Sequence, residues 1–197
     1  MNPPRHEPLA GLALARGTKT PDQAAGVTLR ALPHQPSVIL RGDSGNTPFV
    51  AAFRAALSFE LPLSPNRVGS HDDFTALWLG PSEWLVLGEG GGERLAGYLA
   101  GYHHAIVPNG DGQQIIALAG ARARGVLAKL CPLDLASPDL DPGRCARSLL
   151  ARCTMLLHPQ TGGAYHIHIP RSLADYAWRS LVDAGQEFGV AVVADEV

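Results

Sequence analysis

Two closely spaced histidines are the residues whose type and spacing most directly suggest chemistry. His166 and His168 are separated by one residue within Ala164–Ile169, an apolar run that predicts a strand. Because side chains alternate along a strand, both imidazoles are expected on the same face. Two imidazoles on one face could bind a metal ion, but no third ligand is local and His103-His104 lies on another segment. The pattern therefore favours surface or interface histidines over a metal site.

Cys153 suggests a second kind of chemistry, nucleophilic attack by a thiol. Such a nucleophile needs a base and an orienting group nearby in space, and Cys153 could pair with His166 across neighbouring strands. The residues that follow it, Thr154–Leu157, are typical of a core strand. A buried structural thiol is therefore the favoured interpretation. A small hydrolase that uses Cys153 with His166 or His168 stays open as an alternative.

Two other features are explained without a binding site. The glycine-rich segment Gly88–Gly92 lies between a predicted strand and a predicted helix. It lacks both the Gly-x-Gly-x-x-Gly spacing and the Lys-Ser/Thr end of a phosphate loop, so a connector is expected. The acidic residues fall in predicted loops and caps, where local turns account for them; they include Asp72, Asp73, Asp134, Asp139, Asp141 and Asp175.

Tryptophans and one arginine are candidates for contacts with another chain. Trp78 and Trp84 lie in one predicted hairpin, whereas Trp178 lies in the last predicted helix. Tryptophan is frequent at interface anchors, but this arrangement favours a single packed cluster over a contact site. Arg171 opens the last helix, where the helix dipole disfavours a cation, so it could hold a carboxylate or a neighbouring subunit. We retain Trp78, Trp84 and Arg171 as partner-contact candidates.

The composition excludes several classes of function. Charged residues make up 17% of the 197 residues, below the usual quarter, which fits either a large core or a surface covered by a partner. The net charge of −2 gives no footprint for nucleic acid. Three cysteines without a close pair, and no signal peptide, fit the reducing cytoplasm. No window reaches the roughly 20 apolar residues of a membrane span.

The elements that position these residues follow from hydrophobic period and turn residues. A helix is expected after Asn46 or Thr47, with Pro48 in its first turn. The last helix is expected to start with a capping box of Ser172 and Asp175, and Gly189 is expected to stop it. Further helices are predicted over 93–102 and 121–130, and strands over 27–32, 37–40, 76–87 as a hairpin, 105–107, 113–119, 164–169 and 190–193, with 144–158 mostly extended.

Strand pairs that alternate with helices predict an α+β fold with mostly antiparallel sheets and helices on one face. The natural arrangement is a set of split βαβ, ferredoxin-like units. The hairpin is apolar on both sides, so both of its faces are expected to be covered, one of them by a helix layer or a different polypeptide. Residues 1–25 are expected to form an extended arm. The rest, 26–197, is predicted to be a single domain of two subdomains, about 26–104 and 105–197.

A set of motifs in a fixed order resembles the sarcosine oxidase gamma subunit family. The likeness is colinear from about residue 46 to 190, and the fold of that family is similar to that of the folate-dependent aminomethyltransferase of glycine cleavage. The motifs are LWLGPSEWL at 77–85, LAGARA at 118–123, LAKLCPLDL at 127–135, PGRC at 142–145, IPRSLADYAW at 169–178 and EFG at 187–189.

The resemblance implies a place in a larger enzyme. It implies a heterotetramer of alpha, beta, gamma and delta chains that converts sarcosine to glycine and hydrogen peroxide, with methylenetetrahydrofolate formed from tetrahydrofolate. FAD, FMN, NAD and tetrahydrofolate are expected in the partner chains, and this chain is expected to be a noncatalytic packing subunit. Asp72-Asp73 lacks the apolar run that precedes the paired aspartates of the aminomethyltransferase, so no folate site is carried over. A free-standing folate-binding protein stays open as an alternative.

Overall fold

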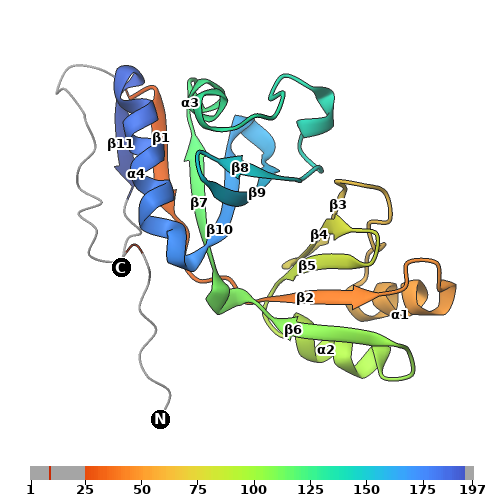
Figure 1. Cartoon of the computed structure of the whole chain (residues 1–197). Coiled ribbons are helices and arrows are strands. Elements are labelled where there is room, and N and C mark those ends of the chain that lie inside the picture. Colours follow the sequence, from red (N-terminus) through yellow and green to blue (C-terminus); the bar gives the residue numbers. More distant parts are fainter. Residues whose placement is uncertain (1–8, 10–24, 194–197) are drawn as a thin grey trace, which may run out of the picture. The chain divides into compact units, whose positions relative to one another are not determined.

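A computed structural model describes residue 9 and residues 25–193 (Figure 1). The chain forms two compact units. Unit 1 contains the described residues up to His34, Gly112–Pro142 and the described residues from Arg147 onward; unit 2 contains Gln35–Asp111 and Gly143–Ala146. The two subdomains expected from the sequence follow one another along the chain, whereas the two units interleave. The expected N-terminal arm, residues 1–25, lies outside the described residues except for Ala25 and for Leu9, which is buried in the core of unit 1.

Unit 1 is built on a six-stranded sheet with two helices. The strand order is β11-β1-β7-β10-β9-β8. The β1–β11 pair is parallel, and the β1–β7, β7–β10 and β10–β9 pairs are antiparallel. The elements are β1 (Val27–Ala31), β7 (Gln113–Ala119), α3 (Ala123–Leu130), β8 (Ala146–Leu150), β9 (Cys153–Pro159), β10 (Tyr165–Pro170), α4 (Ala174–Gly185) and β11 (Val190–Val193).

The core of unit 1 lies on one face of this sheet. Ile167 pairs with Ile116 on one side and with Leu157 on the other, so the three side chains share a face. All three are fully buried, and they belong to one apolar cluster with residues of both helices, including Val126 of α3 and Leu181 of α4. This confirms the expectation of an α+β layer with helices on one face of a mostly antiparallel sheet.

Unit 2 repeats the same architecture with a five-stranded antiparallel sheet in the order β3-β4-β5-β2-β6. Its core joins the sheet to both helices through residues such as Leu40, Phe49, Trp84 and Leu95, all at most 1% exposed. The elements are β2 (Ser37–Gly42), α1 (Thr47–Leu57), β3 (Val68–His71), β4 (Phe74–Gly80), β5 (Glu83–Leu87), α2 (Gly91–Leu99) and β6 (His104–Pro108).

The β4–β5 hairpin confirms the hairpin that the sequence predicts around Pro81. Gly80 pairs with Glu83, so Pro81 and Ser82 form the turn. Trp84 and Val86 enter the helix-covered core, while Leu77 and Leu85, which pair across the hairpin, are also fully buried although they alternate with those residues. Both sides of the hairpin are therefore shielded from solvent, as a strand without polar alternation requires.

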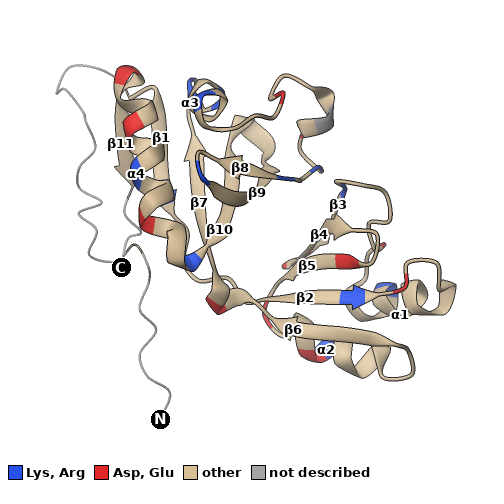
Figure 2. Cartoon of the chain, in the orientation of Figure 1, with Lys and Arg blue, Asp and Glu red and all other residues tan. Residues whose placement is uncertain are grey.

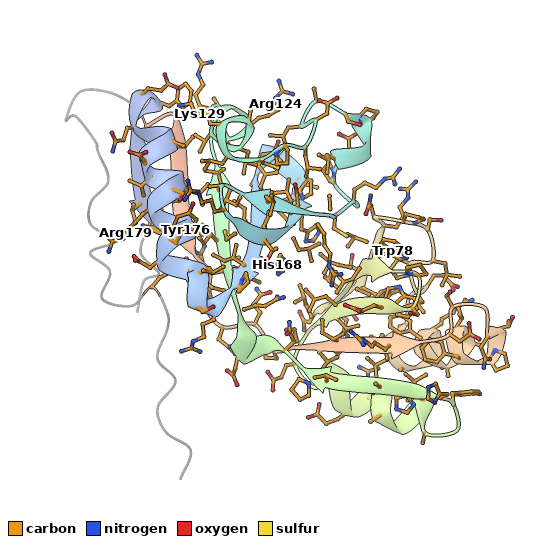
Figure 3. All side chains as sticks on the ribbon, viewed as in Figure 1. Trp78, Arg124, Lys129, His168, Tyr176 and Arg179 are labelled. Carbon is orange, nitrogen blue, oxygen red and sulfur yellow. The ribbon has the colours of Figure 1, made fainter. Side chains whose placement is uncertain are left out.

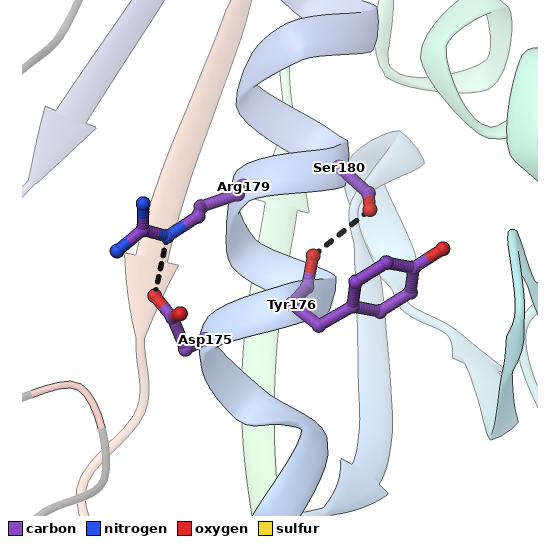
Figure 4. A network of polar contacts seen from close by, with 4 residues as sticks. All are labelled: Asp175, Tyr176, Arg179 and Ser180. Carbon is purple, nitrogen blue, oxygen red and sulfur yellow. Dashed lines mark hydrogen bonds and ion pairs between the residues drawn. The ribbon is translucent and has the colours of Figure 1, made fainter.

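The two best-defined helix starts predicted from the sequence have different outcomes. The side chain of Asn46 accepts a hydrogen bond from the Phe49 N–H at 3.2 Å, which confirms the predicted cap of α1. The capping box at Ser172 and Asp175 is wrong. The 3₁₀ turn Arg171–Leu173 precedes α4, no side chain caps the helix, and Asp175 accepts from Arg179 Nε at 2.7 Å instead (Figure 4). Asp175 lies inside the first turn, so the i,i+4 arginine competes for its carboxylate.

The single tryptophan cluster predicted from the sequence is also wrong. Trp84 belongs to the core of unit 2, and the half-buried Trp78 packs against that core. Trp178 belongs to the core of unit 1. The reason is topological, because α4 covers the sheet of its own unit.

Candidate functional site

Three histidines form a group of titratable side chains on one face of the unit 1 sheet. His166 pairs with His158 across β10 and β9, and His168 lies two positions further along β10. The His158 ring centroid is 6.2 Å from that of His166 and 6.5 Å from that of His168. Because Ile167 and Leu157 point into the core, the histidines occupy the opposite face. We call His158, His166 and His168 the histidine face; His168 is labelled in Figure 3.

Burial keeps these imidazoles neutral at neutral pH. His168 is only 2% exposed, and burial, together with the nearby His158 and His166, lowers its pKa to about 3. Burial and the neighbouring His166 lower the pKa of His158 to about 4. The pKa of His166 is also lowered, first by burial and then by the charge of Arg30. A low dielectric penalises the charged form of each ring, and the rings penalise each other.

The histidine face leaves buried polar atoms without partners. Three ring nitrogens of this face have no hydrogen-bond partner among the described residues. They are both nitrogens of His168 and the Nδ1 of His158. Such orphaned groups are uncommon in folded proteins and cost about 1–3 kcal/mol each. The sequence predicts that His166 and His168 share a face, and the structure confirms it. Within the described part of the chain, no group of three or more His, Cys, Asp or Glu is arranged to hold a metal ion.

The structure does not assemble the alternative hydrolase. Cys153 is buried in the core of unit 1, and its Sγ donates to the Leu150 carbonyl at 3.2 Å. Burial raises the pKa of this thiol, which disfavours the reactive thiolate. His166 lies on the other face of the sheet, where it pairs with His158. His158 is five residues from Cys153, so the Cα atoms of these two residues are about 16 Å apart along β9. Cys153 and His166 therefore do not meet.

The glycine-rich segment and the paired aspartates have local structural roles. Gly88 has φ +129°, and a Cβ there would come within 2.5 Å of the Phe74 ring, so the position demands glycine. Asp72 occupies the turn between β3 and β4 with φ +51°. Asp134 accepts from the Ala136 N–H at 3.0 Å, as expected for a loop aspartate.

The three partner-contact candidates differ in how they are placed. Trp84 is 0% exposed, and its Nε1 donates to the Pro62 carbonyl at 2.7 Å, so this side chain is an anchor of the unit 2 core. Trp78 is half-buried beside the β-bulge that follows it in β4. Arg171 is half-buried in the 3₁₀ turn before α4, close in sequence to the exposed apolar side chains of Leu173 and Tyr176.

Sequence reasoning missed two members of the group around the histidines. His158 was not connected with His166, although counting back from the turn at Pro159–Gly163 would have paired the two positions. The sequence predicts only that Arg30 lies in a strand, and its relation to His166 depends on β7 lying between them. That order of strands is not visible in the local sequence.

Comparison with known proteins gives a consistent result. A family model described as "Sarcosine oxidase, gamma subunit family" matches residues 41–187. The sarcosine oxidase subunit gamma of Corynebacterium sp. (strain U-96) is 32% identical over 195 residues, which covers 96% of this chain and 94% of that protein. The subunit gamma of Arthrobacter sp. is 31% identical over 187 residues, covering 92% and 89%.

Solved structures agree with the sequence matches. A chain of the heterotetrameric sarcosine oxidase from Corynebacterium sp. U-96, in complex with pyrrole 2-carboxylate, superposes with a TM-score of 0.85 at 29% identity, covering 96% of this chain and 99% of that one. The glycine cleavage system aminomethyltransferase T from Bartonella henselae shares the fold, with a TM-score of 0.59 at 16% identity and coverage of 86% and 48%. By its family match, its relatives and its fold, this chain belongs to the sarcosine oxidase gamma subunit family.

Proposed function

We propose that this chain is the noncatalytic gamma subunit of a heterotetrameric sarcosine oxidase. With alpha, beta and delta chains, it would support the oxidative demethylation of sarcosine to glycine and hydrogen peroxide, with formation of methylenetetrahydrofolate. The observation that carries the proposal is the superposition on a chain of heterotetrameric sarcosine oxidase over nearly the full length of both chains.

The cofactors of the reaction are proposed to lie in the partner chains. Oxidation of an amine by oxygen is flavin chemistry, which belongs to the cofactor rather than to side chains. We place FAD, FMN, NAD and tetrahydrofolate in the larger subunits and the assembled enzyme in the cytoplasm. The separation of Cys153 from His166 supports a packing role for this chain, because the thiol and the imidazole face opposite sides of a sheet. Among the described helices, none combines the length and apolar character needed to traverse a bilayer.

The first test is assembly. The purified full chain is expected to show no flavin absorbance and a tendency to aggregate at high concentration, because partner-facing apolar surface is left in water. Co-expression with the alpha, beta and delta chains is expected to give a soluble complex with one copy of each. Size-exclusion chromatography with mass detection measures both outcomes. A stable monomer that does not associate with those chains would contradict the proposal.

We propose Trp78 and Arg171 as contacts to the partner chains. Interface anchors are enriched in Trp and Arg, and part of each of these side chains remains solvent-accessible. Arg171 adjoins Leu173 and Tyr176, which are 37% and 39% exposed on the turn of the chain that enters α4. A large apolar side chain beside an arginine is the composition that interface cores favour. The buried Trp84 is assigned to the core of unit 2 in this proposal.

Substitution of either residue is expected to weaken assembly. Trp78→Ala and Arg171→Ala should each lower the affinity for the partner chains by about tenfold or more, the effect of losing an interface anchor. Matched controls are Tyr98→Ala, an aromatic 53% exposed on α2, and Arg179→Ala, whose guanidinium pairs with Asp175 on α4. Titration of labelled chain into the remaining subunits gives the affinities, and circular dichroism checks the fold. Equal affinities for candidates and controls would remove these two residues from the interface.

A further inference from the structure

We propose that the histidine face, together with Arg30, is a binding site for a small molecule that carries an oxyanion group. This site is separate from the assembly role proposed above, and its residues all belong to unit 1. The chemical class is that of a carboxylate or a tetrahedral oxyanion, because guanidinium and imidazole N–H groups donate hydrogen bonds to oxygen acceptors.

The strand register brings the four side chains to one face. Arg30 on β1 pairs with Ala117 on β7, Ala117 pairs with His166 on β10, and His166 pairs with His158 on β9. Directly paired residues on antiparallel strands point to the same side of a sheet. The methyl group of Ala117 takes up little room, so the long side chain of Arg30 can extend over it toward His166. Besides burial, the charge of Arg30 lowers the pKa of His166, which fits this approach.

The charge of the sheet favours an anion. The six strands of unit 1 contain no Asp or Glu, and their charged residues are Arg30 and Arg147 (Figure 2). An anion therefore meets no carboxylate on these strands, and it meets a guanidinium in the same row as two imidazoles. The guanidinium disfavours a metal cation at the same place, and no metal-binding group was found among the described residues.

The unpartnered ring nitrogens point to a bound ligand independently of the strand register and the charge. His168 is 2% exposed, yet both of its ring nitrogens lack a hydrogen-bond partner, as does the Nδ1 of His158. A neutral imidazole has one donor and one acceptor, and buried groups of this kind are normally paired. A bound oxyanion gives the N–H of each ring an acceptor.

Exposure is graded across the site. Arg30 is exposed, His158 and His166 are half-buried, and His168 is buried. Arg30 is thus the solvent-accessible member of the group, and His168 is its most buried member. A small oxyanion would meet the guanidinium at the solvent-exposed end of the group, and the lower dielectric around the buried imidazoles would strengthen each hydrogen bond to them.

Equilibrium dialysis of the full chain at pH 7 tests the proposal with two probes, radiolabelled sulfate and radiolabelled acetate, with ionic strength fixed by sodium chloride. At least one probe is expected to bind saturably at one site per chain. Arg30→Gln and His168→Leu are each expected to weaken that binding by about tenfold or more, because hydrogen bonds between charged and polar groups contribute this much. Arg179→Gln and His103→Gln, which change exposed residues elsewhere, are the matched controls and should bind as the unchanged chain does.

The two probes distinguish the ligand shape, since sulfate is tetrahedral and the acetate carboxylate is planar. Binding of either one that is lost in the two site variants supports the proposal. His166→Gln, at a half-buried position, provides a third variant if His168→Leu alters the circular dichroism spectrum. Three results would each overturn the proposal. Neither probe saturates, the site variants bind as well as the control variants, or added chloride displaces the probe equally from the site variants and the unchanged chain.

Discussion

Trp84→Ala is expected to lower the free energy of unfolding of unit 2 by about 3–5 kcal/mol, the usual cost of removing a buried tryptophan. The indole is 0% exposed and lies 6.3 Å, centroid to centroid, from the Phe49 ring of α1. Its Nε1 also donates to the Pro62 carbonyl, 22 residues away in the sequence. The change therefore creates a cavity and leaves a buried acceptor unpaired.

Trp84→Phe separates the two effects. The phenyl ring retains most of the packing but cannot donate to Pro62, so the expected loss is about 1–3 kcal/mol, the cost of a buried group left without its partner. Urea denaturation followed by hydrogen exchange at the amides of β4 and β5 reports on this unit, and Tyr98→Ala, on the exposed surface of α2, is the control. A loss below about 1 kcal/mol for Trp84→Ala would show that the core of unit 2 does not depend on this side chain.

Acidification is expected to destabilise unit 1 through the histidine face. Free histidine has a pKa near 6.5, whereas His158 and His168 have folded-state values of about 4 and about 3. The folded state therefore binds fewer protons than the unfolded state, so stability is complete above pH 6.5 and falls as the pH drops toward these folded values. Each histidine contributes about 1.4 kcal/mol per pH unit within that window, and the pair costs about 3–4 kcal/mol between pH 7 and pH 5.

Urea denaturation at pH 7, 6 and 5 measures this dependence. His168→Leu removes one of the three titrating groups of the histidine face, so it is expected to reduce the loss of stability between pH 7 and pH 5 by about 2 kcal/mol. His103→Gln changes an exposed histidine of the other unit and is expected to leave the loss unchanged. Carboxylates contribute equally to the pH dependence of the unchanged protein and of both variants. The difference in stability loss between the variants therefore reports on the histidine alone. An identical pH dependence in His168→Leu and the unchanged chain would contradict the assignment.

Local signals in the sequence were enough to predict most of the elements. The hairpin at 76–87 follows from Pro81 and its apolar flanks, and the start of α1 follows from Asn46 and Pro48, because these preferences act within a few residues. The buried state of Cys153 also followed from its apolar neighbours. The predicted capping box of α4 is wrong because Arg179, one helical turn away, donates to the carboxylate of Asp175.

Long-range pairing explains what the sequence did not reveal. The row from Arg30 to His158 spans four strands drawn from three separate parts of the chain. The assignment of Trp178 and Trp84 to different cores depends on which sheet each helix covers. Neither follows from periodicity, because period and turn residues define elements but leave their neighbours unspecified. The family resemblance, by contrast, was found because its motifs keep their order along the chain.

The parallel β1–β11 pair has a consequence for how the protein is made. β1 (Val27–Ala31) is translated long before β11 (Val190–Val193), so the sheet of unit 1 cannot be completed until β11 has been synthesised. Most of unit 2, Gln35–Asp111, is synthesised between these two strands, and domains tend to fold as they emerge from the ribosome. The growing chain must therefore hold β1 unpaired with β11 until β11 has been made, and a truncation before Val190 would remove this edge strand from the sheet.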